Sequence, residues 1–252
     1  MIAGRHALVT GGGSGVGRAI ALALAQAGVA VTICGRREAA LAAVAAERPG
    51  LHPLVADVTD EAQVASLYAA AEAARGPFEV VVANAGMSGS APAHRTSLAD
   101  WQRTLAVNLT GSFLTVKPAL GGMVKRRAGR IVFVASTAGL KGYSYVAPYV
   151  AAKHGVVGLM RALASETAKS GVTVNAVCPG FVETDMLDES VRRIATTTGR
   201  SVEDARWSLA STNPQGRFVQ PSEVAAAVLW LCSAEAGSIT GQALSISGGE
   251  TW

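Results

Sequence analysis

Seven short runs rich in Val, Ile and Leu alternate along the chain with Ala- and Leu-rich stretches of helical length. These runs are residues 6–10, 29–34, 51–56, 78–83, 130–135, 172–177 and 243–247. Strands that alternate with helices pair in parallel, and right-handed crossovers place the helices on both faces of the sheet. Strands covered on both faces are apolar throughout, as these runs are. The sequence therefore predicts an α/β fold with a doubly wound parallel sheet of about seven strands.

The length of the chain bounds the number of domains. With 252 residues, half of them hydrophobic and 16% charged, the chain can bury one large core. We predict a single domain over residues 1–252. Residues 185–215 depart from the alternation with a polar, helix-prone insertion, which predicts a lid over the substrate.

The apolar segments and the cysteines bear on location. The N-terminal segment has no long apolar stretch behind a basic one, so it does not resemble a secretory signal. Residues 19–34 are strongly apolar but are interrupted by Gln26 and Gly28, which predicts a helix followed by a strand and no membrane span. Three widely spaced cysteines indicate reduced thiols. We predict a cytoplasmic protein without membrane contact.

The charged residues and histidines bear on partners. The net charge is +4, but Lys and Arg are scattered except for a short cluster at Lys125, Arg126, Arg127 and Arg130. We interpret this cluster as a solvated face, and keep as an alternative a nucleic-acid binder with strongly salt-dependent affinity. The four histidines share no metal-ligand spacing with one another or with the cysteines. We predict no bound nucleic acid and no metal.

A glycine-rich turn follows the first predicted strand and opens a helix. Without side chains, backbone N–H groups and the helix N-terminus can approach a pyrophosphate closely. This context favours a dinucleotide site over an ordinary tight turn. The predicted contacts are Gly11, Gly13, Ser14, Gly15, Val16 and Gly17.

Arg36 and Arg37 follow the second predicted strand, where a site specific for NAD would place an acidic residue on the ribose 2′-hydroxyl. Guanidinium groups form charge-assisted bonds with a 2′-phosphate instead. We therefore predict NADP(H), with NAD(H) as the less favoured cofactor. Asp57, at the end of the third strand, would accept from the adenine amine or cap the next turn.

Ser136 ends the fifth predicted strand, and Tyr149 and Lys153 lie four residues apart at the start of a later helix. That spacing places both side chains on one helical face. A phenol has a pKa of about 10, and a nearby ammonium favours the phenolate by roughly 1–3 units. We expect Lys153 to lower the pKa of Tyr149 and so to let it exchange protons.

Taken together and in this order, these motifs resemble the short-chain dehydrogenase/reductase family. The resemblance rests on residues 10–17, Asn84-Ala85-Gly86, Asn108, Ser136, Tyr149 with Lys153, and Pro179-Gly180. It implies a Rossmann-like fold, with Tyr149 as general acid/base, Ser136 holding the substrate oxygen and Lys153 binding the nicotinamide ribose. It also implies a water-linked proton relay at Asn108. Further cofactor contacts would come from Val58, Asn84, Ala85, Gly86, Pro179, Gly180, Val182 and Thr184.

The choice of substrate rests on finer resemblance. Residues 147–158, 174–184 and 220–224 are most similar to bacterial polyketide ketoreductases and 3-oxoacyl-thioester reductases, which implies a β-keto substrate, possibly held as a thioester. Arg127 matches a position that would contact a carrier arm, or lies in a solvated turn. Residues 87–92 lack the proline-glycine-glycine groove of many polyketide ketoreductases. We expect Tyr143, Tyr145 and residues 186–187 to line an apolar pocket.

Two other functions stay open. One is an NAD(P)-dependent secondary-alcohol or 3-hydroxy-acid dehydrogenase, and the other is a catalytically silent cofactor sensor. The complete set of Asn108, Ser136, Tyr149 and Lys153 argues against the sensor, which needs only nucleotide contacts. Apolar residues 239–252 and the helices predicted near 99–123 and 148–169 suggest subunit contacts, and the resemblance implies a homotetramer.

Overall fold

The computed structural model describes residue 2 and residues 5–252. Within them, seven strands form one parallel sheet in the order β3-β2-β1-β4-β5-β6-β7. The strands are β1 His6–Thr10, β2 Ala30–Gly35, β3 Leu51–Val55, β4 Val80–Ala83, β5 Gly129–Val134, β6 Val172–Pro179 and β7 Ala243–Ile246. The predicted doubly wound sheet is confirmed. Its strands begin or end within two residues of the predicted runs.

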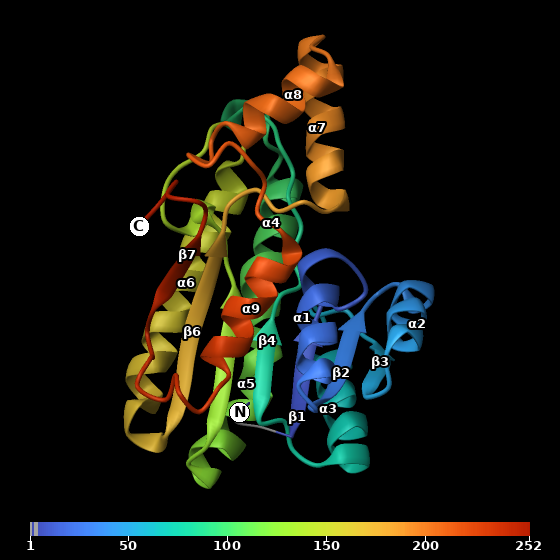
Figure 1. Cartoon of the computed structure of the whole chain (residues 1–252), viewed down its shortest axis with the longest axis vertical. Coiled ribbons are helices and arrows are strands. Elements are labelled where there is room, and N and C mark those ends of the chain that lie inside the picture. The colour runs from blue at the N-terminus through green and yellow to red at the C-terminus, as the bar shows by residue number, and fades with distance from the viewer. Residues whose placement is uncertain (1, 3–4) are drawn as a thin grey trace.

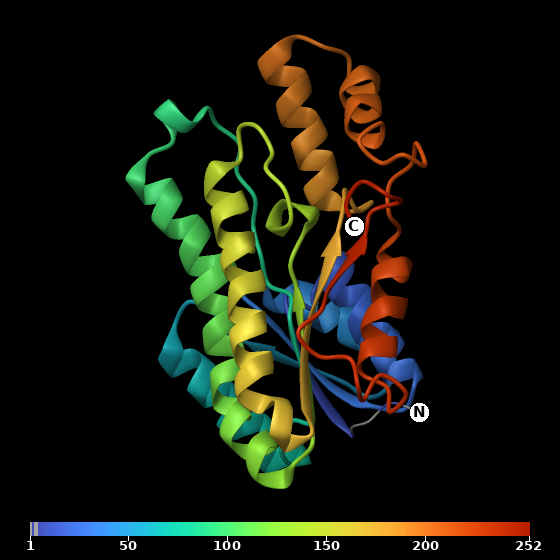
Figure 2. The same cartoon turned by 90° about the vertical axis from the view of Figure 1, so that its left-hand side faces the viewer.

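Helices cover both faces of the sheet (Figures 1 and 2). On one face lie α1 (Gly15–Gln26), α2 (Glu38–Glu47) and α9 (Pro221–Leu231), and on the other lie α3 (Glu61–Arg75), α5 (Gly111–Arg126) and α6 (Ala147–Thr167). Each face has its own core. Ile33 belongs to the core on the first face together with residues of α1 and α9, and Phe133 belongs to the core on the second face together with residues of α5 and α6.

One long helix predicted near residues 99–123 is interrupted in the structure. It consists of α4 (Leu98–Leu105), one turn of π-helix over Ala106–Thr110, and then α5. Short 3₁₀ turns lie at Ala93–Arg95, Thr137–Gly139 and Ala168–Ser170. The π turn contains Asn108, and such turns occur frequently at functional sites.

Residues 185–215 contain two helices, α7 (Asp185–Thr198) and α8 (Val202–Ala210), which stand beyond the carboxyl end of β6 (Figures 1 and 2). They have a small core of their own. Leu187 and Val191 from α7 pack with Ala205 from α8 and with Phe218, apart from the two clusters on the sheet.

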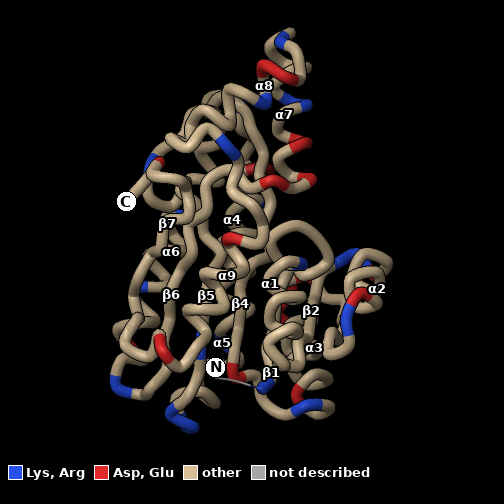
Figure 3. The backbone as a smooth tube through the Cα atoms, viewed as in Figure 1, with Lys and Arg blue, Asp and Glu red and all other residues tan. Residues whose placement is uncertain are grey.

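The basic cluster is only partly a solvated face: Lys125, Arg126 and Arg127 are exposed, as interpreted from the sequence, but Arg130 is not. Arg130 is only 9% exposed, and its guanidinium donates to the carbonyls of Gly129 and Ser233. Arg127 donates to the Lys169 carbonyl and, at φ +54, ends α5 in the left-handed region. These side chains therefore tie elements together. Elsewhere Lys and Arg are spread over the molecule (Figure 3).

Three further observations concern binding and location. Across residue 2 and residues 5–252, no helix is long and apolar enough to cross a membrane. The same residues contain no group of three or more His, Cys, Asp or Glu placed to hold a metal. Cys34, Cys178 and Cys232 are buried free thiols.

Candidate active site

The order of the strands determines where a ligand can lie. The chain runs outward from β1 in one direction through β2 and β3, and in the other from β4 to β7. Ligands bind in such sheets beyond the carboxyl ends of the strands, where the order reverses. That point lies between β1 and β4, and the glycine-rich turn after β1 lies there with residues 84–86 after β4.

The glycine-rich turn has the geometry of a pyrophosphate cradle. Gly11 and Gly15 have φ values of +67° and +52°, which disfavour any side chain. A Cβ on Gly17 would lie 2.3 Å from the Gly11 carbonyl oxygen, so the turn packs directly on α1. Ser14 makes no capping bond to α1, whose first turn contains no acidic residue. Free N–H groups at a helix N-terminus suit an anion.

Residues after β4 hold this turn in place. The Asn84 side chain donates to the Thr10 carbonyl oxygen at 2.8 Å, and the Thr10 hydroxyl accepts from the backbone N–H groups of Asn84 and Ala85 at 3.0 and 3.1 Å. Sequence analysis assigned no role to Thr10. It joins β1 to β4 and fixes the switch point.

Two arginines flank the end of β2. Arg37 donates to the Ser14 hydroxyl at 3.2 Å, so its guanidinium lies beside the glycine-rich turn. Arg36 is 74% exposed and lies 3.9 Å from an Asp57 carboxylate oxygen. Asp57 also accepts from the Thr59 N–H and hydroxyl, and these bonds, with the N–H as the largest contribution, lower the pKa of Asp57. Its capping role is therefore present, and a bond to adenine stays a prediction.

Asn108 in the π turn is completely buried. Its side chain donates to the carbonyls of Met87 and Thr104, both at 2.9 Å, and accepts from the Met87 N–H at 3.2 Å. A Cβ on Gly86 would lie 2.9 Å from Asn108 Oδ1 and 3.8 Å from Lys153 Nζ, so Gly86 separates these two groups. On the other side of the π turn, Gly111 packs against Val58.

Tyr149 and Lys153 lie on one face of α6, directed at the end of β5. Lys153 is 4% exposed, and its ammonium donates to the Val134 carbonyl oxygen at 2.8 Å and lies 5.6 Å from the Tyr149 ring centroid. Ser136 follows β5, and its hydroxyl accepts from the Ala138 N–H and hydrogen bonds with Tyr149. Three of the four predicted catalytic side chains are thus brought together here.

Burial controls the protonation of this pair. It raises the pKa of Tyr149, and the hydrogen bond from Ser136 opposes that effect. It also lowers the pKa of Lys153 to about 8. Desolvation of the phenolate is thus the largest influence on the pKa of Tyr149, and the lowering by Lys153 stays a prediction.

Residues after β6 complete the site. Pro179 is buried at the end of the strand, Val182 forms a parallel bridge with Val219, and Thr184 is the N-cap of α7. A Cβ on Gly15 would lie 3.2 Å from Thr184 Cγ2, so the segment from β6 lies against the glycine-rich turn. The cofactor contacts predicted in two distant parts of the sequence are neighbours.

Comparison with known proteins agrees with this geometry. Residues 5–195 match the short chain dehydrogenase family. The chain belongs to the short-chain dehydrogenase family. The predicted resemblance is therefore confirmed, and this protein is an oxidoreductase of that type.

Several members resemble this short-chain dehydrogenase over nearly its whole length. It is 42% identical to a protein of Streptomyces violaceoruber that is named as a ketoacyl reductase of granaticin polyketide synthase. The match covers 96% of this chain and 92% of the relative. The chain is 38% identical to the acetoacetyl-CoA reductase of Shinella zoogloeoides, covering 98% of both chains. A variant of actinorhodin polyketide ketoreductase, crystallised with NADPH, superposes with a TM-score of 0.95 at 40% identity, covering 98% of this chain and 97% of the other.

The predicted pocket lining of this short-chain dehydrogenase is only partly as expected. Leu187 is 3% exposed and packs inside the cluster of α7 and α8, so its assignment to a pocket wall is wrong. Tyr143 is half-buried and its ring meets Phe181 edge-on at 6.4 Å. Its hydroxyl bonds to Glu250, a residue that sequence analysis did not single out.

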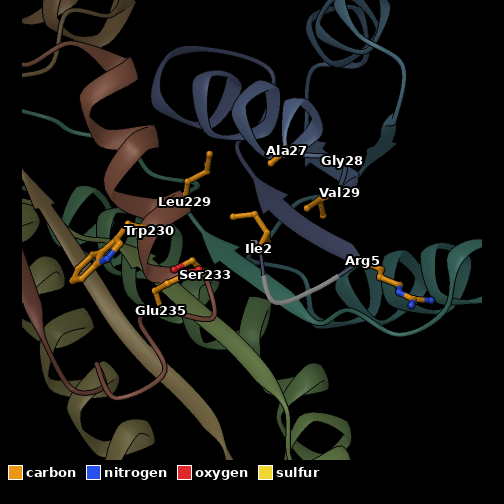
Figure 4. Close-up of a pocket in the computed structure, with 9 residues that line it drawn as sticks. All are labelled: Ile2, Arg5, Ala27, Gly28, Val29, Leu229, Trp230, Ser233 and Glu235. Carbon is orange, nitrogen blue, oxygen red and sulfur yellow. The ribbon is translucent and has the colours of Figure 1, made fainter.

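A separate groove lies between the end of α1 and the end of α9 (Figure 4). It is lined by Ile2, Arg5, Ala27, Gly28, Val29, Leu229, Trp230, Ser233 and Glu235. These residues flank the amino ends of β1 and β2 and the end of α9, whereas the catalytic residues follow the carboxyl ends of strands. The groove therefore takes no part in the candidate active site.

Proposed function

We propose that this short-chain dehydrogenase reduces the ketone of a β-keto substrate with NADP(H), in a reversible reaction that uses Tyr149 as the proton donor. The observation that carries the proposal is the meeting of Ser136, Tyr149 and Lys153 at the carboxyl edge of the sheet, beside the glycine-rich turn. A cofactor sensor would need only the glycine-rich turn, and it would have no use for side chains that transfer protons.

The nucleotide end of the site fits NADP(H). Gly11 and Gly17 let the turn pack directly on Asn84 and α1, where a Cβ would collide, and the N-terminus of α1 has no side-chain cap and suits a pyrophosphate. Arg37 lies beside that turn and Arg36 is exposed, so two guanidinium groups can approach a 2′-phosphate. Relatives that include a ketoreductase crystallised with NADPH support the same choice.

The residues divide the chemistry among them. When bound, the reduced nicotinamide supplies the hydride. Burial keeps the proton on Tyr149, which can donate it to the carbonyl oxygen as negative charge develops there. Ser136 stabilises that oxygen by a hydrogen bond. Lys153 is held by Val134 with further N–H groups available to ribose hydroxyls.

Residues around Asn108 connect this centre to its surroundings. Asn108 lies across Gly86 from Lys153, and its side chain is engaged with Met87 and Thr104. We assign it the task of holding the π turn in place beside the ammonium. The water-linked relay implied by the family resemblance would then run along backbone groups of this turn rather than through the Asn108 side chain.

Support for a β-keto substrate comes from relatives named as a ketoacyl reductase and an acetoacetyl-CoA reductase. A docking role for Arg127 in carrying a thioester is not part of the proposal. Arg127 precedes β5 and lies at the amino edge of the sheet, whereas Ser136 follows the other end of this strand, whose six residues span about 20 Å at roughly 3.3 Å per residue.

Initial rates would test the proposal. We would follow NADPH and NADH oxidation with acetoacetyl thioesters, β-keto esters, aryl ketones and a bicyclic ketone. Selective oxidation of NADPH by the β-keto compounds is the expected result. Preference for aryl ketones or for NADH would instead indicate a secondary-alcohol dehydrogenase, and NADPH binding without turnover of any ketone would indicate the sensor.

A further inference from the structure

Glu250, in the segment after β7, has a buried carboxylate whose two oxygens differ in their surroundings. Its side chain is 2% exposed. Oε1 accepts from the Tyr143 hydroxyl at 2.6 Å and lies 3.0 Å from the Lys141 ammonium. Oε2 is buried and has no hydrogen-bond partner among the described residues. A buried acceptor without a donor is costly, so such an arrangement needs an explanation.

The Tyr143 hydroxyl is fixed from two sides. It lies 2.6 Å from both Glu250 Oε1 and Thr137 Oγ1. A phenol has one proton and a carboxylate only accepts, so Tyr143 donates to Glu250 and accepts from Thr137. These two short hydrogen bonds hold the end of the side chain and so restrain the orientation of its ring. The Lys141 ammonium, 4.9 Å from the ring centroid, covers it further.

This cluster lies beside the reacting groups. Thr137 directly follows Ser136, and the Tyr143 phenol is near enough to Tyr149 for the two to interact electrostatically. On the other side, a Cβ on Gly180 would lie 3.1 Å from Glu250 Oε2. Glu250 therefore joins the segments that follow β5, β6 and β7, and it does so within the candidate active site.

We propose that Glu250 is a positioning residue, which holds the Tyr143 ring as a fixed wall of the substrate pocket. The inference rests on the proposed function for the identity of the pocket. Glu250 need not touch the substrate. Its effect passes through Tyr143, whose hydroxyl donates to Oε1.

A double-mutant cycle would test this role. The variants are Glu250→Leu, Tyr143→Phe and their combination, with Glu250→Gln as the conservative variant. Each is assayed with NADPH and either ethyl acetoacetate or a bicyclic ketone, and ketone dissociation constants are measured in complexes with NADP⁺, in which no reduction can occur. Melting temperatures and NADPH affinities are measured in parallel.

The expected result is a specific pattern. Each single variant raises KM and the dissociation constant for ethyl acetoacetate about tenfold, while kcat changes less than threefold, because a hydrogen bond to a charged group is lost. The double variant is no worse than either single one, because all three lack the same bond. Glu250→Gln, which keeps an acceptor for Tyr143, stays within threefold of the wild type.

Other patterns would overturn the inference. Additive effects in the cycle, or unchanged ketone binding in Glu250→Leu, would mean that Glu250 does not act through Tyr143. A fall in melting temperature with equal losses in Glu250→Leu and Glu250→Gln would indicate a role in stability alone. Wild-type protein that binds ethyl acetoacetate without reducing it would contradict the proposed function, while the binding cycle would still decide the role of Glu250. Failure to bind either ketone would contradict both.

A matched control is available on the surface. Glu61 lies 2.7 Å from the Lys117 ammonium and is 66% exposed, between α3 and α5. Glu61→Leu removes a lysine–glutamate pair of similar length outside the candidate site. It should leave KM for both ketones within twofold of the wild type, since exposed pairs contribute little.

Discussion

At the scale of single residues, burial acts on Tyr149 and Lys153 in opposite directions. It disfavours the charged form of each, so it raises the pKa of the phenol and lowers that of the ammonium. A phenol that keeps its proton is ready to act as an acid in ketone reduction. The reverse reaction needs the phenolate, so oxidation should gain more than reduction from a rise in pH.

Replacement of Tyr149 tests the proton donor. Tyr149→Phe keeps the ring and its packing but removes the hydroxyl, so kcat should fall by about 10²–10⁴-fold. The dissociation constant for NADPH, measured by its fluorescence, should stay within threefold. Turnover within a few-fold of the wild type would show that another group supplies the proton.

Replacement of the two arginines tests cofactor choice. Arg36→Leu with Arg37→Leu should raise KM for NADPH at least tenfold and change KM for NADH little, because only NADPH has the 2′-phosphate. Arg75, which bonds to His52 at the far end of α3, provides the control Arg75→Leu. Equal losses for both cofactors would mean that the arginines only shape the loop.

The lowered pKa of Lys153 predicts a dependence of stability on pH. Between about pH 8 and the unfolded pKa near 10.5, the unfolded chain holds a proton that the folded chain lacks, so this residue makes stability rise with pH. Lys153→Met removes that effect. The free energy of unfolding of the variant minus that of the wild type should therefore fall by on the order of 2–3 kcal/mol between pH 7 and pH 10.

Urea denaturation of cofactor-free protein at one fixed concentration measures this difference. Lys117→Met, at an exposed position on α5, is the control. A difference that stays constant across the range would show that Lys153 keeps its ordinary pKa in the folded protein.

At the scale of elements, the sequence predicts the features that follow a repeating apolar pattern, and it misses local irregularities of the backbone. Apolar runs identify the strands because both of their faces are covered. The π turn around Asn108 leaves no such trace, since one extra residue barely changes the apolar pattern of a long helix. The spacing of Tyr149 and Lys153 predicts their shared face, but it contains no information on their burial, which decides their pKa values.

Helices α7 and α8 should close over the substrate as one unit, because they share a small core. Leu187→Ala removes a buried side chain from that core and should loosen both helices. We expect faster proteolysis within residues 185–215 and a higher KM for the ketone, with NADPH affinity within threefold. Val202→Ala, at a 56% exposed position on α8, should change neither. Cleavage elsewhere in the chain would argue against an independent lid.

At the scale of the whole molecule, parallel strands bring distant parts of the sequence to one edge. The fold class was therefore enough to predict that residues 11–17, 84–86, 136 and 180–184 meet. It was not enough to place Glu250 on Tyr143, because that contact depends on how the loops after β5 and β7 pack. Nor did it place Arg127, whose motif position gave no indication that it lies at the opposite edge of the sheet.

The predicted homotetramer can be tested by mass. Four chains of 25.6 kDa would give about 102 kDa, and closed symmetric assemblies of this kind are common. Size-exclusion chromatography with light scattering measures the mass directly. Trp230 on α9 is 46% exposed beside the groove of Figure 4, so Trp230→Glu should shift the mass toward dimers if this face is buried between subunits. A mass of one chain would contradict the prediction.

The separate core of α7 and α8 also matters for laboratory evolution. Substitutions confined to residues 185–215 fall on a cluster that shares none of its buried members with the two cores on the sheet. Libraries limited to this segment, or segments exchanged from relatives, should therefore vary substrate scope while most recombinants still fold. The sheet and its cofactor site would stay constant while residues 185–215 are replaced.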